Sequence, residues 1–187
     1  MVIGLDISGS TSGGVVARIK AAGLHMAELL HRLGVTFAVY AHTGTPTNLD
    51  AGGDYSTDTW SLDVVVVKDP KERWTDATRE RLRRVCPLMC NLDGHTLEYY
   101  RKVCERQQAT DKLVMYFTDG AMPGQNYGEE LEILQREIRE APGRGISIVG
   151  VGVGTDSPNA HGLDTVRLDD LEDVPRLVRE LEQRLTA

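Results

Sequence analysis

Three short polar segments follow apolar runs in this chain, and their residue types suit the binding of a hard divalent cation. They are Asp6-Ile7-Ser8-Gly9-Ser10, Asn91-Leu92-Asp93-Gly94-His95-Thr96 and Thr118-Asp119-Gly120. Mg²⁺ prefers about six oxygen ligands at roughly 2.1 Å and usually keeps some water. Ser8 and Ser10, two residues apart on a turn, would supply neutral oxygens. Asp6 and Asp119 would supply charge and hold water around the ion. Mn²⁺ or Ca²⁺ could take the same place.

Strands and helices alternate along the chain, which is typical of a parallel sheet with helices on both faces. Short apolar runs predict strands at 2–7, 35–41, 62–67, 112–117, 146–153 and 166–168. Apolar residues at helical spacing predict helices at 14–33, 75–86, 95–107, 127–140 and 171–185. Residues 42–59 are rich in Gly, Thr and Asp and predict a loop. The expected fold class is α/β, with a Rossmann-like, doubly wound, mostly parallel central sheet.

The polar segments are expected to meet at one edge of this sheet. In doubly wound sheets, ligands bind at the carboxyl ends of the strands, where the strand order reverses. The segments that begin at Asp6 and Thr118 each follow a predicted strand, and the segment from Asn91 to Thr96 opens a predicted helix. The sequence therefore predicts that these residues form one site.

Length, net charge and hydropathy indicate one domain and argue against several classes of function. A chain of 187 residues suits one domain, which we place at residues 1–187. The net charge of −7 argues against nucleic acid as the main partner. The apolar runs are far shorter than the roughly 20 residues that span a bilayer, and the residues from Met1 to Asp6 lack the basic and apolar pattern of a signal peptide, so we expect neither a membrane span nor a signal peptide. Three cysteines, Cys86, Cys90 and Cys104, suggest reduced thiols, so we expect a cytoplasmic protein that binds no membrane.

Together with Val149-Gly150-Val151-Gly152-Val153-Gly154, the first and third segments resemble the von Willebrand factor A (vWA) domain family. The resemblance covers nearly the whole chain and implies the vWA fold with a metal-ion-dependent adhesion site (MIDAS). In such a site, Ser8 and Ser10 would ligate Mg²⁺ directly, while Asp6 and Asp119 would act mainly through water. The bound ion would hold an acidic residue of a protein partner.

The middle segment departs from the usual vWA pattern, in which a Gly-Gly-Thr turn supplies a Thr ligand. Here the turn is Asn91-Leu92-Asp93-Gly94, which is similar to the C-terminal vWA domain of the CobT-type subunit of the ATP-dependent cobaltochelatase. We favour Asp93 as the ligand, and Thr96, one turn further into the helix, is the alternative. A carboxylate ligand would bind the ion more tightly and weaken its pull on an incoming acid.

The resemblance also implies a partner, because the CobT-type protein assembles with an AAA+ ATPase subunit. We therefore expect a protein-binding adaptor, or a non-catalytic subunit of a chelatase-like ATPase complex. His95 and His42 are candidate partner contacts at the mouth of the site. A basic cluster at Arg79, Arg81, Arg83 and Arg84 predicts either a solvated helix face or a surface for an acidic partner.

An enzyme is the alternative function. Residues 3–11 also resemble the first phosphate loop of actin-like ATPases and sugar kinases, so the segment from Asp6 to Ser10 could bind phosphate in a phosphotransfer enzyme or ATPase. That fold needs a strand directly after the loop, whereas a long helical pattern follows here. A P-loop kinase is excluded because no Gly-Lys-Ser/Thr triplet occurs. The sequence also pairs no nucleophile with an activating base.

Overall fold

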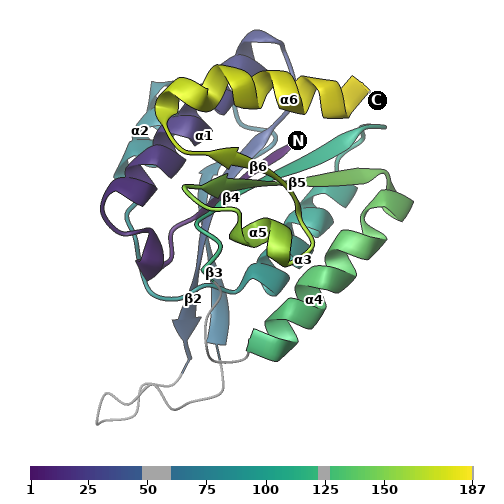
Figure 1. The fold of residues 1–187 in the computed structure, drawn as a ribbon. Coiled ribbons are helices and arrows are strands. Elements are labelled where there is room, and N and C mark those ends of the chain that lie inside the picture. The colour runs from purple at the N-terminus through teal and green to yellow at the C-terminus, as the bar shows by residue number, and fades with distance from the viewer. Residues whose placement is uncertain (48–59, 122–126, 187) are drawn as a thin grey trace.

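A single mixed sheet lies at the centre of the fold. The computed structural model describes residues 1–47, 60–121 and 127–186. The strands are β1 (Val2–Asp6), β2 (Ala38–Pro46), β3 (Trp60–Lys68), β4 (Lys112–Thr118), β5 (Ile146–Val153) and β6 (Asp164–Leu168). Their order is β3-β2-β1-β4-β5-β6, and every neighbouring pair is parallel except β2 with β3. The expected doubly wound, mostly parallel α/β architecture is confirmed (Figure 1).

Helices cover both faces of the sheet (Figure 1). They are α1 (Gly14–Arg32), α2 (Asp76–Arg84), α3 (Asp93–Glu105), α4 (Tyr127–Glu140), α5 (Ser157–Ala160) and α6 (Val174–Thr186). The core on one face joins the sheet to α1, α2 and α6, and the core on the other face joins it to α3 and α4. None of the helices in the described residues is long and apolar enough to cross a membrane.

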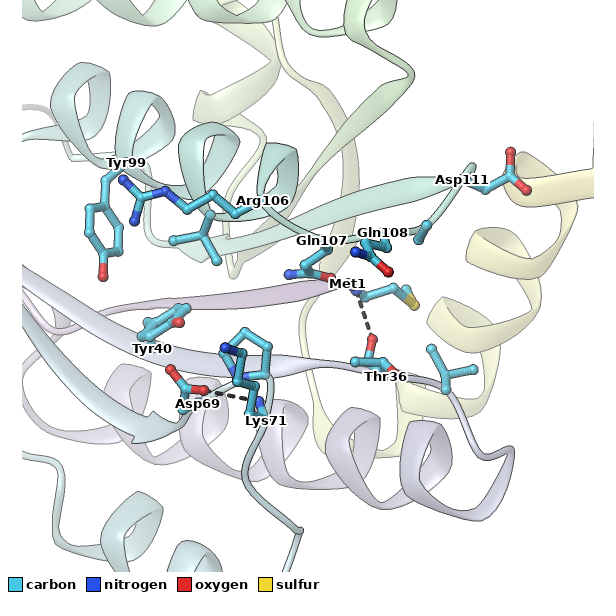
Figure 2. Close-up of a pocket in the computed structure, with 14 residues that line it drawn as sticks. Met1, Thr36, Tyr40, Asp69, Lys71, Tyr99, Arg106, Gln107, Gln108 and Asp111 are labelled. Carbon is cyan, nitrogen blue, oxygen red and sulfur yellow. Dashed lines mark hydrogen bonds between the residues drawn. The ribbon is translucent and has the colours of Figure 1, made fainter.

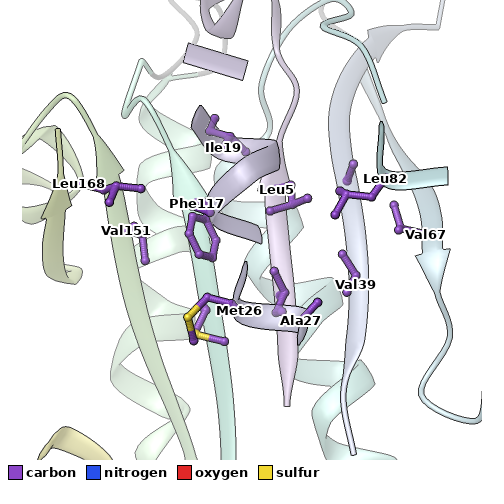
Figure 3. Packing of buried hydrophobic residues seen from close by; sticks show 14 of the residues in the cluster. Leu5, Ile19, Met26, Ala27, Val39, Val67, Leu82, Phe117, Val151 and Leu168 are labelled. Carbon is purple, nitrogen blue, oxygen red and sulfur yellow. The ribbon is translucent and has the colours of Figure 1, made fainter. Parts of the chain in front are cut away.

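Helix α1 packs along the strands that carry the polar segments. Its apolar stripe includes Ile19, Met26 and Ala27, which lie against Leu5 of β1 and Phe117 of β4 (Figure 3). All five of these side chains are at most 3% exposed. Strands buried on both faces read as continuous apolar runs, which is why β1 and β4 could be recognised from the sequence. This packing fixes the ends of β1 and β4, where the polar residues begin.

The sequence-based bounds of β2 were wrong. The strand was expected at 35–41 and a loop at 42–59, but β2 begins at Ala38 and continues to Pro46. His42, Thr43 and Gly44 pair with β3 in antiparallel register, and Gly44 also bridges Cys90. Cross-strand hydrogen bonds satisfy the backbone of this polar stretch, so it needs no apolar run to remain in the sheet. Residues 48–59 of the expected loop lie outside the described residues.

The start of α3 also differs from the expectation, which was residue 95. The helix begins at Asp93, so Asp93 and Gly94 belong to its first turn. Gly94 allows a close approach to α4, because a Cβ atom on it would lie 2.5 Å from the backbone oxygen of Glu130. The candidate ligand Asp93 is therefore fixed by helix packing and does not lie in a loose turn.

The basic cluster of α2 is paired within the chain. Arg79 donates to Glu28 of α1 from Nε at 2.5 Å, Arg81 pairs with Glu72, and Arg84 lies 2.9 Å from Glu80. Arg83 lies 3.7 Å from the same Glu80. Exposed pairs of this kind contribute little to stability. Of the two interpretations of this cluster, the arrangement favours a solvated helix face.

The contact between Glu28 and Arg79 predicts a pH dependence of stability. Hydrogen bonds from Arg79, above all, lower the pKa of Glu28 to about 2 from an ordinary value of 4.5, and Trp74 donates a further bond. Between those values the unfolded chain binds more protons, so this contribution is lost as the pH falls from about 4.5 to about 2. The stability difference between wild type and Glu28→Gln should therefore shrink over that range in urea denaturation. A difference that stays constant with pH would contradict this assignment.

Candidate metal site

The candidate site lies where β1 and β4 end side by side. Asp6 is the last residue of β1, and Thr118 is the last residue of β4. The chain leaves β1 toward β2 on one side, whereas β4 lies on the other, so the strand order reverses at this point. Such a reversal opens a crevice at the carboxyl ends of the strands. The expected meeting of the first and third segments at one edge is therefore observed.

Asp6 is the hydrogen-bond centre of the site and is completely buried. Its Oδ1 accepts the backbone N–H of Ser8 at 2.8 Å. Its Oδ2 accepts the hydroxyl of Thr118 at 2.8 Å and the side-chain amide of Asn91 at 3.2 Å. Burial raises the pKa of Asp6, although hydrogen bonds from Ser8 and Thr118 oppose that rise. The carboxylate thus anchors all three polar segments while remaining a poorly compensated negative charge.

The two serines form a hydroxyl pair above Asp6. Their Oγ atoms are 3.1 Å apart, with Ser8 only 2% exposed and Ser10 exposed. The turn that carries them is fixed by hydrogen bonds of 2.7 Å from Gly9 N to Met89 O and from Leu88 N to Ile7 O. One hydroxyl is therefore buried beside the carboxylate, and the other faces solvent.

Asn91 joins the two buried carboxylates of the site. Its Nδ2 donates to Asp6 Oδ2 and, at 2.9 Å, to Asp93 Oδ1. Asp93 is 4% exposed and also accepts the hydroxyl of Tyr116 at Oδ1. Burial, and next the charge of Asp6, raise the pKa of Asp93. The alternative ligand, Thr96, is fully buried, and its Oγ1 has no hydrogen-bond partner among the described residues.

Asp119 lies at the rim of the site and is partly exposed. Its Oδ1 accepts the backbone N–H of Ala121 at 3.0 Å, and the preceding Thr118 hydroxyl accepts the N–H of Gly120 at 2.9 Å. Its charge contributes to the raised pKa of Asp6. Asp119 is therefore close enough to act on the site electrostatically while its own carboxylate faces the rim.

Three observations fit a cation held by hydroxyls and water. Ligands at adjacent positions of an octahedron with bonds of 2.0–2.1 Å are about 3.0 Å apart, which matches the spacing of the Ser8 and Ser10 hydroxyls. Asn91 Oδ1 is buried without a hydrogen-bond partner among the described residues. In that same part of the chain, no ion pair includes Asp6, Asp93 or Asp119.

The site is not built like a cage of carboxylates or histidines. Within residues 1–47, 60–121 and 127–186, no group of three or more His, Cys, Asp or Glu side chains is arranged to hold a metal ion. Neutral oxygens would then have to complete the ligand set, as Mg²⁺ sites that retain water allow. The hydroxyls of Ser8 and Ser10 are the neutral oxygens expected from the sequence at this place.

The two candidate partner contacts, His95 and His42, lie in different surroundings. The side chain of His95 is 45% exposed, and its Nδ1 pairs with Glu130, a buried residue of α4. The Glu130 carboxylate also accepts the backbone N–H of Gly94 at 2.8 Å, which fixes the first turn of α3. His42 has no exposed surface, and its ring nitrogens bond to the hydroxyls of Tyr100 and Tyr116. The expectation that His42 touches a partner is therefore corrected, because its side chain lies in the core.

Several residues of the site could not be found from the sequence. The sequence indicates only a turn at Asn91, and it places Tyr116 within the predicted strand 112–117 and Glu130 within the predicted helix 127–140. Tyr116 occupies an apolar strand, so its hydroxyl gave no signal of a polar role. Glu130 lies 36 residues from Gly94 in the chain. The only signal for Asn91 was its place two residues before Asp93, at a helix start where side-chain amides often bond locally.

A pocket lies at the other end of the strands. It measures about 990 Å³ and is lined by Met1, Tyr40, Lys71, Tyr99 and Arg106, among others (Figure 2). These residues come from the amino ends of the parallel strands and from the end of α3, whereas Asp6 and Thr118 lie at the carboxyl ends. The pocket is therefore separate from the candidate metal site.

Comparison with known proteins identifies both a family and a fold. Residues 1–186 match the family model described as the VWA domain of the cobalamin biosynthesis protein CobT. The vWF domain of the pili tip protein Mfa5 from Porphyromonas gingivalis aligns with a TM-score of 0.67 at 11% identity, covering 98% of this chain and 95% of that one. A search of curated proteins finds no significant match.

Two further solved structures share the fold within longer chains. A von Willebrand factor type A protein from Catenulispora acidiphila aligns with a TM-score of 0.59 at 18% identity, over 96% of this chain and 41% of that one. The pilus adhesin SpaC from Lactobacillus rhamnosus GG aligns with a TM-score of 0.62 at 10% identity, over 98% and 29%. This chain therefore spans less than half of either protein. At such identities the likeness shows the fold alone.

Proposed function

The chain belongs to the family of CobT VWA domains, and we propose that it is a protein-binding module with a MIDAS-type cation site. Ser8, Ser10 and Asp93 would hold Mg²⁺, or Mn²⁺ or Ca²⁺ in its place, with Asp6 and Asp119 acting through water. When bound, the ion would supply a positive charge for which an acidic side chain of a partner is a suitable ligand. The partner class that the family suggests is an AAA+ ATPase.

The arrangement around Ser8 and Ser10 carries this proposal. The hydroxyl pair has the spacing of adjacent octahedral ligands, and the buried carboxylates beneath it have no cation among the described ion pairs. An unpaired buried charge is costly, and the cost is relieved by protonation or by a cation. A cation at this place would compensate Asp6 and Asp93 at once. Burial is the main cause of the raised pKa of both groups.

The surroundings of the serines suit a protein partner. Leu88 and Met89, on the segment that braces the serine turn, are 48% and 38% exposed. His95, at the start of α3, has its Nδ1 bound to Glu130, which leaves Nε2 as the ring nitrogen that an outside acid could approach. Exposed apolar side chains beside a polar centre are typical of protein interfaces. We propose that the partner places an acidic residue at the ion and apolar residues on this rim.

The phosphate-loop alternative finds less support in the same segment. A phosphate loop works by presenting free backbone N–H groups to the anion. Here the N–H groups of Ser8, Gly9, Thr11 and Ser12 already donate to oxygens of the protein. The side chain of Asp6 lies directly beneath the turn and would repel a phosphate. We therefore do not favour a phosphotransfer function.

Titration of the purified chain with Mg²⁺ tests the cation site. We expect one binding event by isothermal titration calorimetry and a higher melting temperature in Mg²⁺ than in EDTA, because a ligand that binds the folded state stabilises it. The partner role is tested by pull-down of the AAA+ ATPase of a cobaltochelatase from the same genome, in Mg²⁺ and in EDTA. The cation proposal fails if neither heat nor melting temperature responds to the metal. The partner proposal fails if capture is equal in both buffers or absent from both.

Two single substitutions distinguish Asp93 from Thr96 as a ligand. Asp93→Asn keeps the size and an acceptor but removes the charge, so we expect Mg²⁺ affinity to fall by at least about 10-fold. Thr96→Val keeps the shape and removes an unpaired buried hydroxyl, so we expect little change in affinity and no loss of stability. Calorimetric titration of both variants measures the difference. The reverse order of effects would assign the ligand to Thr96.

A further inference from the structure

A chain of buried polar side chains leads from the core to the candidate metal site. Tyr100 of α3, His42 of β2, Tyr116 of β4 and Asp93 of α3 are each at most 4% exposed. The Tyr100 hydroxyl lies 2.9 Å from His42 Nδ1, and the Tyr116 hydroxyl lies 3.0 Å from His42 Nε2. The Tyr116 hydroxyl also donates to Asp93 Oδ1. Three hydrogen bonds thus connect four side chains that come from two strands and one helix.

The direction of each hydrogen bond follows from the proton count. When Asp93 is ionised, as a cation ligand is, its Oδ1 can only accept, and it accepts from Asn91 Nδ2 and from Tyr116. The opposite orientation of the Asn91 amide would place its oxygen against two carboxylates. Because Tyr116 gives its single proton to Asp93, its oxygen can only accept from His42, which must then carry hydrogen on Nε2.

The same reasoning determines which group donates the hydrogen bond between His42 Nδ1 and Tyr100. A neutral imidazole has one N–H, so Nδ1 is an acceptor when Nε2 carries the hydrogen, and Tyr100 must be the donor to it. Burial lowers the pKa of His42 to about 3, which keeps the ring neutral at ordinary pH. With Asp93 ionised, no other neutral form of the ring satisfies all three bonds. The chain of hydrogen bonds therefore runs one way, from Tyr100 through His42 and Tyr116 to Asp93.

We infer that Tyr116 is a positioning residue that orients the Asp93 carboxylate toward the cation, and that His42, as its Nε2–H tautomer, holds the Tyr116 hydroxyl in place. Both bonds described for Asp93 go to Oδ1, which leaves Oδ2 as the oxygen that can face the ion. Hydrogen bonds that orient a ligand in this way typically change metal affinity by about 10–100-fold. The role of Tyr116 at the cation rests on the proposed function, whereas the direction of the three hydrogen bonds does not.

The tautomer can be tested in the metal-free protein at a pH well above the raised pKa of Asp93, where this group is ionised. Long-range ¹H–¹⁵N spectra distinguish the two neutral tautomers of histidine, and the resonances of His42 can be assigned through bonds. We expect a single Nε2–H form in the wild type and a changed or mixed form in Tyr116→Phe, which removes the acceptor of that hydrogen. An Nδ1–H form or a cationic ring in the wild type would overturn the inference, whatever the metal does.

The positioning role is tested by Mg²⁺ titration of matched Tyr→Phe variants. Tyr116→Phe should weaken Mg²⁺ binding by about 10–100-fold. Tyr40→Phe is the control. Tyr40 is 3% exposed and stacks on Tyr100 at 5.9 Å between ring centroids, but it is not one of the four side chains joined by the three hydrogen bonds. This variant should bind Mg²⁺ as the wild type does. Equal affinities for the two variants would overturn the positioning role while leaving the cation site itself intact.

A second variant keeps the test decisive if Tyr116→Phe does not fold. Tyr100→Phe removes the first donor, which is three hydrogen bonds away from Asp93, so we expect a mixed His42 tautomer and a smaller loss of Mg²⁺ affinity than for Tyr116→Phe. An unchanged tautomer and unchanged affinity in Tyr100→Phe would overturn the inference. If the wild type itself does not bind Mg²⁺, the proposed function and the positioning role both fail, and the spectra still decide the direction of the chain.

Discussion

Replacing Ser8 and Ser10 together by alanine is expected to abolish Mg²⁺ binding and to leave the fold intact. The two hydroxyls are the neutral oxygens placed to contact the ion, and they bond to each other at 3.1 Å. The bond that anchors the turn to Asp6 comes from the backbone N–H of Ser8, which alanine retains. The double variant should therefore melt within a few degrees of the wild type in EDTA. It should show no rise in melting temperature and no heat of binding in Mg²⁺.

Ser12→Ala is the matched control for the double variant. Ser12 belongs to the same segment and is exposed, and its hydroxyl donates to Gly9 O at 2.7 Å without touching the pair. We expect this variant to equal the wild type in Mg²⁺ binding and in capture of the proposed AAA+ partner. The double variant should lose the metal-dependent part of that capture. Wild-type Mg²⁺ affinity in the double variant would show that the serines are not ligands.

The sequence was sufficient to locate the site because its main residues end buried strands. Asp6 and Thr118 each follow an apolar run, and the edge at which parallel strands end is fixed by the fold class. Neighbouring strands bring these two residues together although they are 112 positions apart. Position along a strand was thus enough to predict that the two segments meet. The same reasoning failed at β2, where polar residues stay in the sheet by pairing with β3.

The roles of His42, Tyr100 and Tyr116 could not be predicted from the sequence, because they depend on which atoms meet in the core. His42 was expected at the surface because its neighbours Thr43 and Gly44 are polar, yet its register opposite Asp6 places it between two tyrosines. Tyr100 and Tyr116 were recognisable only as apolar helix and strand positions. His42 bonds to Tyr100 and Tyr116, which lie 58 and 74 positions further along the chain. Neither periodicity nor composition indicates contacts between residues so far apart.

Gly94→Ala is expected to destabilise the protein, although alanine normally favours a helix over glycine. A Cβ atom at this position would lie 2.5 Å from the backbone oxygen of Glu130 and 2.8 Å from Cβ of Ile133. Backbone cannot yield as a flexible side chain would, so α3 must move away from α4. Overpacking of this kind costs about 1–3 kcal/mol, and we expect about 2 kcal/mol in urea denaturation.

Gly128→Ala, on the facing helix α4, is the matched control with the opposite sign. Among the described residues, a Cβ atom there meets nothing within 4 Å, and Gly128 is the second residue of α4, so alanine should stabilise the protein by less than the roughly 1 kcal/mol expected in a helix interior. Gly94→Ala should also weaken Mg²⁺ binding, because Gly94 lies between Asp93 and His95 in the turn that Glu130 fixes. A Gly94→Ala variant with wild-type stability and wild-type Mg²⁺ affinity would show that the approach of α3 to α4 does not position Asp93. The packing of α3 against α4 would then have no effect on the metal site, whereas the close contact of Gly94 with Glu130 predicts that it does.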